Sequence, residues 1–325
     1  MFQFPDQTCS LRSPRRVAGR SIPVSATSWL RFLFLLVVGA SHTSTPLSAE
    51  QADNPTAANT RVILNHPELN ESSGLAFSHR RSARIWTHND SGDGPRLFSF
   101  DLEGKHRGTC LLAGIQAVDW EDMASFRHND TAYLLVGDIG DNDWRRRELQ
   151  LHLFAEPDPD RSGAIDDFQT IRLRLPMGAR DCEGLAVDAA SGQVFLASKR
   201  FVPVCEIMVF SLAPWLSDSA SSTAPVWVQP RHVATVPVPL VTAMDIDPSS
   251  REIVLCSYFE AFVYRKPTPE SSWLAALKQS PTVIRLPRLR QVEAIAFDSA
   301  KRLWITSEGV PARLARLAQP EIQPR

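Results

Sequence analysis

Glu183-Gly-Leu-Ala-Val-Asp188 is one of five similar segments that recur along the chain. Each segment begins with a small or acidic residue and continues through small and apolar residues, as a short β-strand does. The other four are Ser73-Gly-Leu-Ala-Phe-Ser78, Glu121-Asp-Met-Ala-Ser-Phe126, Thr242-Ala-Met-Asp-Ile-Asp247 and Glu293-Ala-Ile-Ala-Phe-Asp298. Their first residues lie 48, 62, 59 and 51 positions apart, which is the period of a four-stranded propeller blade with loops of different lengths.

The residues that follow each segment complete such a blade. A second apolar strand comes next in every unit, as Ile85-Trp-Thr87, Leu134-Leu-Val136, Val194-Phe-Leu196, Ile253-Val-Leu255 and Leu303-Trp-Ile305. A third strand follows in every unit, and a fourth follows in all units except the last. The last unit reaches the end of the chain before a fourth strand, whereas a spare strand, Arg61-Val-Ile-Leu64, precedes the first unit.

The sequence therefore predicts an all-β fold, a β-propeller of five four-stranded blades whose last blade is closed by the N-terminal strand. Closure of this kind removes the exposed sheet edges that an open array would have. Six blades are the alternative, but the long stretches left over, 155–167 and 212–230, are polar or rich in Pro and Ser. An all-β sandwich would need five matching strand starts to occur in order by chance.

The first fifty residues differ from the rest. Several arginines precede the apolar run Phe32-Leu-Phe-Leu-Leu-Val-Val-Gly-Ala40, and no acidic residue lies between Asp6 and Glu50. This pattern predicts a signal peptide with its flank over 1–49, a linker over 50–60 and the propeller domain over 61–325. A membrane anchor is the alternative, but a span needs about 20 apolar residues. We expect an exported protein, periplasmic or extracellular, with no stable membrane span after processing.

The composition limits the functions that the chain can have. Lys and Arg number 35 against 36 Asp and Glu, so a basic surface for nucleic acid is not expected. The sequence contains no Gly-rich phosphate loop, no His-Glu-x-x-His, no paired-Cys zinc spacing and no Gly-x-Ser-x-Gly. Four cysteines follow the predicted signal peptide, and they could form disulfides or serve as buried core residues.

Blade geometry predicts where the polar residues meet. The loop into the first strand of a blade and the loop out of its second strand lie on one face, here called the mouth. The residue that opens each repeat should face this mouth: Ser73, Glu121, Glu183, Thr242 and Glu293. The residues two positions earlier should lie on the same side: Glu71, Asp119, Asp181, Leu240 and Gln291. The ends of the second strands add more polar residues there, including His88-Asn-Asp90, Asp138, Ser198-Lys-Arg200, Tyr258 and Glu308.

Carboxylates gathered at one mouth repel each other unless a cation, a basic group or shared protons offset the repulsion. Oxygen ligands favour Ca²⁺ or another divalent cation, and the expected metal ligands are Glu121, Asp138, Glu183 and Glu293. The expected ligand-binding residues are Asn89, Asp119, Asp181, Lys199, Arg200 and Tyr258. If the site is catalytic, the candidate bases are His88, Asp90 and Glu308.

Alternatives remain at three of these positions. The segment Gly137-Asp-Ile-Gly-Asp-Asn-Asp143 could be a metal loop or a loop of Asx-turns that needs no metal. Lys199 and Arg200 could neutralise the carboxylates or hold an anionic ligand beside a cation. His88 could act as a base, or it could be a hydrogen-bonding residue at a strand end.

Four segments together resemble signatures of secreted bacterial propeller proteins with tryptophan-aspartate-repeat-like or NHL-like labels: Thr87-His-Asn-Asp-Ser-Gly92, Asp119-Trp-Glu-Asp-Met-Ala124, Val136-Gly-Asp-Ile-Gly-Asp-Asn142 and Ile305-Thr-Ser-Glu-Gly309. The resemblance implies fold and export, and no particular reaction. Calcium-dependent propeller phytases and metal-dependent propeller lactonases are more distantly similar in architecture. By that analogy Glu121, Asp138, Glu183 and Glu293 would surround the channel, although the signature motifs of those enzymes are not recognisable here.

Three functions follow from the sequence. The first is binding of a cation, a small molecule or a protein or peptide at the mouth. The second is metal-dependent hydrolysis of a phosphoester, lactone or sugar at the same place, so the question of an enzyme stays open. The third is a non-catalytic scaffold for interactions, in which the carboxylates and Lys199 form a closed salt-bridge network.

Overall fold

The structure is a computed structural model that describes residues 60–217 and 227–318, all within one compact unit, Ala52–Arg325. The predicted signal peptide over 1–49 and nearly all of the predicted linker lie outside the described residues. Within the described ranges, no helix is long and apolar enough to cross a bilayer. Two short helices lie in the described residues, α1 (Ala213–Leu216) and α3 (Trp273–Leu277).

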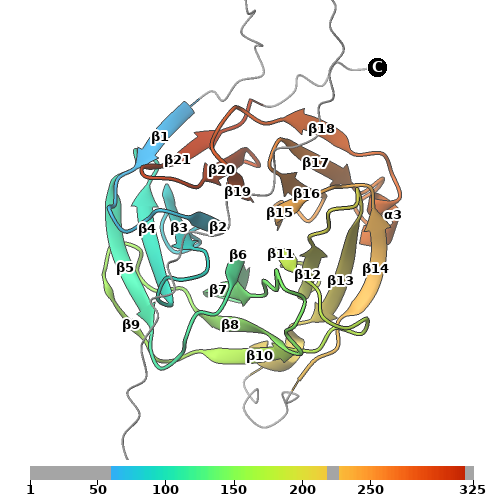
Figure 1. Cartoon of the computed structure of the whole chain (residues 1–325), viewed down its shortest axis with the longest axis horizontal. Coiled ribbons are helices and arrows are strands. Elements are labelled where there is room, and N and C mark those ends of the chain that lie inside the picture. The colour runs from blue at the N-terminus through green and yellow to red at the C-terminus, as the bar shows by residue number, and fades with distance from the viewer. Residues whose placement is uncertain (1–59, 218–226, 319–325) are drawn as a thin grey trace, which may run out of the picture. The chain divides into compact units, whose positions relative to one another are not determined.

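Five antiparallel sheets surround a central axis, one for each sequence repeat (Figure 1). Blade 1 contains β2 (Ser72–Phe77), β3 (Arg84–Asn89), β4 (Arg96–Asp101) and β5 (His106–Leu112). Blade 2 contains β6 (Trp120–His128), β7 (Thr131–Asp138), β8 (Leu149–Ala155) and β10 (Gln169–Leu173). Blade 3 contains β11 (Cys182–Asp188), β12 (Gln193–Ser198), β13 (Cys205–Ser211) and β14 (Arg231–Val236). Blade 4 contains β15 (Val241–Ile246), β16 (Glu252–Ser257), β17 (Glu260–Arg265) and β18 (Thr282–Arg285).

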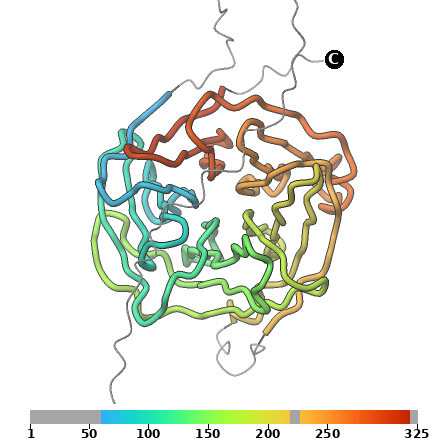
Figure 2. The backbone as a smooth tube through the Cα atoms, viewed as in Figure 1, coloured from blue at the N-terminus to red at the C-terminus, as the bar shows by residue number. Residues whose placement is uncertain are grey.

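Blade 5 combines the two ends of the chain. It contains β19 (Val292–Phe297), β20 (Leu303–Ser307), β21 (Ala312–Arg316) and β1 (Thr60–Leu64). β1 pairs antiparallel with β21 along its whole length, and Figure 2 shows the blue and red parts of the tube meeting there. The predicted all-β fold, the five blades and the closure by the N-terminal strand are confirmed.

One strand was not expected. β9 (Gly163–Ile165) lies in the long polar stretch 155–167 and pairs parallel with β5, which gives blade 1 a fifth, outermost strand. Blade 2 thereby covers part of the outer edge of blade 1. The described residues contain no sixth blade.

The hydrophobic core lies between the blades. Its buried residues form five clusters, and each cluster fills the space between two adjacent blades. The innermost strands carry small residues where they converge on the axis. At Gly184, for example, an added Cβ would lie only 2.9 Å from the Cβ atoms of Ala197 and Met244. The four cysteines of the described chain, Cys110, Cys182, Cys205 and Cys256, are buried and free, so they are core residues.

A β-bulge occurs at the same place in every blade. The pairing of strand one with strand two shifts after Ser72, Trp120, Cys182, Val241 and Val292. The extra residue in each bulge is the one that opens the sequence repeat: Ser73, Glu121, Glu183, Thr242 and Glu293. Because a bulge redirects a side chain and bends its strand, this repeated irregularity presents one polar residue per blade at the mouth.

Candidate functional site

The mouth brings carboxylates from three blades within metal-ligating distance of one another. Asp90, Asp119 and Glu121 form one triplet, and Glu121, Asp181 and Glu183 form a second; within each, the ligand atoms lie within 4.8 Å of one another. Asp90 follows β3 of blade 1, Asp119 and Glu121 flank the start of β6, and Asp181 and Glu183 flank the start of β11. Glu121 belongs to both triplets and therefore lies at the centre of the site.

The charge of the Glu121 carboxylate is not offset by any hydrogen-bond donor of the described chain. Glu121 is also buried, with only 4% of its surface exposed. Burial, followed by the charges of Glu183 and Asp90, raises its pKa well above the ordinary value. Burial and the charges of Asp90 and Asp181 likewise raise the pKa of Asp119 to about 7. Without a cation, both shifts favour the protonated forms of these carboxyl groups.

The second triplet contains its own counter-ion. Lys199 Nζ lies 2.8 Å from Glu183 Oε1 and 5.5 Å from the centroid of the Tyr258 ring. Burial opposes the charge of this ammonium, but Glu183, Tyr258 and Glu293 outweigh that effect and raise the pKa of Lys199, which is therefore charged. Asp181 Oδ1 accepts a hydrogen bond from the backbone N–H of Asp141 at 2.9 Å. The two triplets therefore differ, because only the second has a charged lysine beside it.

Blade 5 contributes two more carboxyl groups, Glu293 in the bulge of β19 and Glu308 after β20. The charge of Glu293 acts on Lys199, and the charge of Glu308 acts on Glu293. Burial is the main cause that raises the pKa of each, and neighbouring carboxylates add to it. Both shifts favour the protonated forms of these two groups when no cation is near.

Asp138, Arg200 and Asn89 are among the predicted residues that lie outside the two triplets, and each has partners of its own. Asp138 forms an ion pair with Arg146 at 2.6 Å, and its other oxygen accepts the N–H of Val118 at 2.9 Å. Arg200 pairs with Glu206 on β13 at 3.3 Å rather than with the mouth carboxylates. Asn89 is a local organiser, because its side-chain oxygen accepts the backbone N–H groups of Asn70 and Glu71 at 3.1 Å each.

His88 is buried with no exposed surface, and its ring packs directly over Gly74. Its Nδ1 is 2.9 Å from the carbonyl oxygen of Asn89. Burial is the main cause that lowers the pKa of His88 to about 4. Of the alternatives that the sequence left open, this geometry fits the structural histidine at a strand end.

The loop 137–143 holds itself together by Asx-type contacts. The two carboxylate oxygens of Asp141 accept the N–H groups of Arg145 and Arg146 at 2.8 and 3.0 Å. Arg146 returns a hydrogen bond to the carbonyl oxygen of Gly140 at 2.8 Å. These contacts hold Gly140 so close to the carboxyl groups of Glu121 and Asp119 that an added Cβ would overlap them.

Gly140→Ala is expected to weaken cation binding at the mouth by about tenfold, because the new methyl group displaces Glu121 and Asp119. Isothermal titration with CaCl₂ measures the change. Gly163→Ala is the matched control, since a Cβ at Gly163 meets nothing within 4 Å. Equal affinities in Gly140→Ala and the control would show that these two carboxylates do not bind the ion.

Two aspartates that were not predicted as site residues lie along the axis, Asp122 fully buried and Asp245 half-buried. Asp122 accepts the N–H groups of Leu185 at 2.8 Å, Met244 at 3.0 Å and Met123 at 2.8 Å. It therefore links the innermost strands of blades 2, 3 and 4. Asp245 of β15 accepts the N–H of Phe297 in β19 at 2.7 Å. Together they satisfy backbone donors on the inner edges of strands, which have no neighbouring strand on the axis side.

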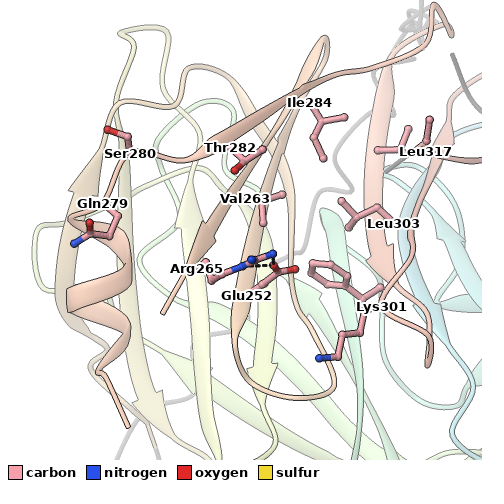
Figure 3. A pocket seen from close by; sticks show the side chains of 12 residues that line it. Glu252, Val263, Arg265, Gln279, Ser280, Thr282, Ile284, Lys301, Leu303 and Leu317 are labelled. Carbon is pink, nitrogen blue, oxygen red and sulfur yellow. Dashed lines mark hydrogen bonds and ion pairs between the residues drawn. The ribbon is translucent and has the colours of Figure 1, made fainter. Parts of the chain in front are cut away.

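A separate cavity of about 330 Å³ lies between blades 4 and 5, away from the mouth (Figure 3). Val263, Ile284 and Leu303 form part of its lining. Glu252 pairs with Arg265 across the strand pair β16–β17, as the dashed lines in Figure 3 show. The charge of that arginine is thus neutralised within the protein.

Comparison with known proteins finds no matching family model and no matching curated protein. Among solved structures, a gluconolactonase from Xanthomonas campestris shares 16% sequence identity with a TM-score of 0.43, covering 76% of this chain and 72% of that one. A glucose dehydrogenase shares 11% identity with a TM-score of 0.47, covering 80% of this chain and all of that one. At such values neither likeness assigns a reaction to the chain.

Proposed function

We propose that the mouth binds a divalent cation, Ca²⁺ in the first place, with Asp90, Asp119 and Glu121 as its protein ligands. The observation that carries the proposal is the carboxylate of Glu121, buried among other carboxylates and without a hydrogen-bond donor. An isolated buried carboxylate is costly, and a hard cation with oxygen ligands removes that cost. Partly exposed Asp90 and Asp119 leave room for water to complete the coordination shell.

The second triplet supports a single ion rather than two. The ammonium of Lys199 already lies 2.8 Å from Glu183, and its charge would repel a second cation there. We also propose, from the N-terminal pattern, that binding takes place outside the cytoplasm, where calcium modules bind with dissociation constants of roughly 10⁻⁴–10⁻³ M.

A thermal melt of the full chain tests the cation site. A chelator is added first, and CaCl₂, MgCl₂ or MnCl₂ is then restored. An ion that binds only the folded state stabilises it by about 2.7 kcal/mol at a hundred times its dissociation constant, which raises the melting temperature by several degrees. No shift with any of the three ions at millimolar concentration would refute the proposal.

The pH dependence of stability follows from the raised pKa values. Asp119 keeps its proton in the folded state up to about pH 7, whereas the unfolded chain loses it near pH ~3.9. The stability that this proton confers is complete below the unfolded value and is lost as the pH rises through the folded value. We therefore expect the cation-free protein to lose stability between about pH 4 and 7.

A bound cation replaces these protons, so its affinity should increase with pH. Melts at pH 5 and pH 8, each with and without CaCl₂, measure both effects. The calcium-induced shift should be larger at pH 8, and a shift that is equal or larger at pH 5 would contradict the assignment of these carboxylates as ligands.

Metal-dependent hydrolysis is a second candidate, favoured by Glu308. This half-buried carboxyl lies beside the cluster, and burial and Glu71 raise its pKa, as suits a group that accepts a proton from water near neutral pH. A screen of phosphate esters, lactones and glycosides with CaCl₂ tests it. For any substrate that turns over, Glu308→Gln should lower the rate at least a hundredfold and keep the calcium-induced shift in melting temperature. If no substrate turns over while calcium binds, the protein acts as a binder.

A further inference from the structure

Exposed apolar side chains surround the mouth. In every blade the loop from strand two to strand three lies on the mouth face. In blades 2 to 5 this loop carries a large exposed apolar residue. These residues, the apolar rim, are Trp144 (50% exposed), Phe201 (88%), Phe259 (73%) and Val310 (69%). Val118, Met177 and Val202, also exposed, lie in loops of the same face. Soluble proteins seldom expose such residues together unless something binds to them.

The opposite face is different. Its turns from strand one to strand two, at 78–83, 129–130, 189–192, 247–251 and 298–302, expose no large apolar residue in the described chain. Aspartates order three of these turns by accepting backbone N–H groups: Asp188, Asp247 and Asp298. Two exposed apolar residues, Trp227 and Leu274, lie in connections from strand three to strand four, which are also on the opposite face, and Ile63, Leu111 and Val283 lie on outer strands. In the described chain the exposed large apolar residues are therefore concentrated on the mouth face, which has seven against two on the opposite face.

The apolar rim adjoins the acidic site directly. The rings of Phe259 and Tyr258 lie 6.3 Å apart, and Tyr258 in turn contacts Lys199. Trp144 lies in the loop between β7 and β8. In the same loop, the backbone N–H of Asp141 donates a hydrogen bond to Asp181. An occupant that covers the rim would thus also cover the carboxylates.

We propose that the mouth face binds an extended polypeptide segment of a partner protein, with large apolar residues on the apolar rim and a neighbouring Lys or Arg side chain directed at the mouth. This rests on the mouth being the binding site proposed above, but it does not depend on which ion is bound. The two triplets contain five acidic side chains, and Lys199 forms an ion pair with only one of them, Glu183, so a basic side chain of a partner would complement the mouth.

Other occupants fit less well. A second copy bound face to face would bring two acidic mouths together, and like charges across an interface cost several kcal/mol. Anionic lipid headgroups would be repelled in the same way, since membrane surfaces attract basic segments. A small molecule in the mouth would leave rim residues on separate blades uncovered.

A display library of random dodecapeptides, panned against the full chain in CaCl₂, tests the proposal. Enriched peptides should combine Lys or Arg with Leu, Phe or Trp. A synthetic copy of an enriched peptide should bind at least tenfold more weakly to the double variant Phe201→Ser/Phe259→Ser, and more weakly at high salt. Leu111→Ser/Val283→Ser is the control, because it removes the same kind of exposed apolar residue from outer strands, and its affinity should be unchanged.

No enrichment, enrichment of acidic peptides, or equal binding to the rim variant would each overturn the proposal. So would rim-dependent binding to phosphatidylglycerol vesicles or a rim-dependent dimer in sedimentation, in the absence of peptide binding. The calcium-induced shift in melting temperature is measured on the same variants. Peptide binding without that shift would refute the cation site alone, and the shift without peptide binding would refute only the partner.

Discussion

Glu121→Gln is expected to abolish stabilisation by divalent cations while the protein stays folded. Glutamine has nearly the same shape, but it removes one negative charge from the centre of both carboxylate triplets. Loss of a central anionic ligand should weaken calcium binding at least a hundredfold, so that a shift of about 2.7 kcal/mol in wild type falls close to zero at the same concentration. In chelator, the variant should melt at the wild-type temperature or above it, because it removes a buried and repelled carboxylate.

Parallel melts of wild type, Glu121→Gln and Glu103→Gln measure this effect. Glu103 is an exposed carboxylate in the turn between β4 and β5, so its variant controls for the loss of a charge away from the mouth. An undiminished calcium response in Glu121→Gln would remove the main support for the site. A large loss of stability in chelator would instead show that Glu121 has a structural partner.

Asp122→Ala is expected to destabilise the fold by about 3 kcal/mol or more. The substitution leaves the backbone donors of Leu185, Met244 and Met123 without an acceptor in the interior, and each unpaired donor costs about 1–3 kcal/mol. For a domain of this size the melting temperature should fall by roughly 6–12 °C. Asp122→Asn keeps one side-chain oxygen as an acceptor, and we expect less than half of this loss.

Urea unfolding followed by far-ultraviolet circular dichroism measures the free energies of the three proteins. A loss below about 1 kcal/mol in Asp122→Ala would mean that water or a neighbouring group replaces the carboxylate. Calcium should still stabilise both variants, since Asp122 belongs to neither triplet. That retained response separates the linker role of Asp122 from ion binding.

The sequence was sufficient for the blades and for most of the mouth. Strand alternation and antiparallel order place the start of strand one beside the end of strand two, whatever the loops do. For this reason Asp119, Glu121, Asp181 and Glu183 could be brought together from register alone, and the structure places them so. Asp90 followed from the same rule, because it comes just after β3.

Contacts that depend on loop path and on local irregularity could not be predicted. Asp138 lies at the mouth end of its strand, as predicted for a metal ligand. The loop that follows places Arg146 beside it, and the two residues form an ion pair. Arg200 likewise turns to Glu206 of the next strand. Nothing in the residue types alone distinguishes these outcomes from a place in the mouth.

The two axial aspartates did leave a trace in the sequence. Asp122 stands in a column whose other members are Gly74, Gly184, Ala243 and Ala294, and Asp245 stands in a column of alanines, Ala76, Ala124, Ala186 and Ala296. At each of these two positions, four of the five repeats have Gly or Ala and one has Asp. This pattern indicates that the narrow space on the axis has room for only one larger side chain at each position. The five bulges could not be recognised in the sequence, because a bulge changes the direction of a side chain and leaves the residue pattern as it was.

The pairing of β1 with β21 also sets an order of events in time. The ribosome makes Thr60–Leu64 before all the other strands of the ring and Ala312–Arg316 after them, so a growing chain cannot close the ring until blade 5 has been synthesised. Contacts between distant parts of a chain form slowly, and until then β1 and β2 lack their neighbours in blade 5. The ring of this protein therefore stays open until the strands of blade 5 have been made.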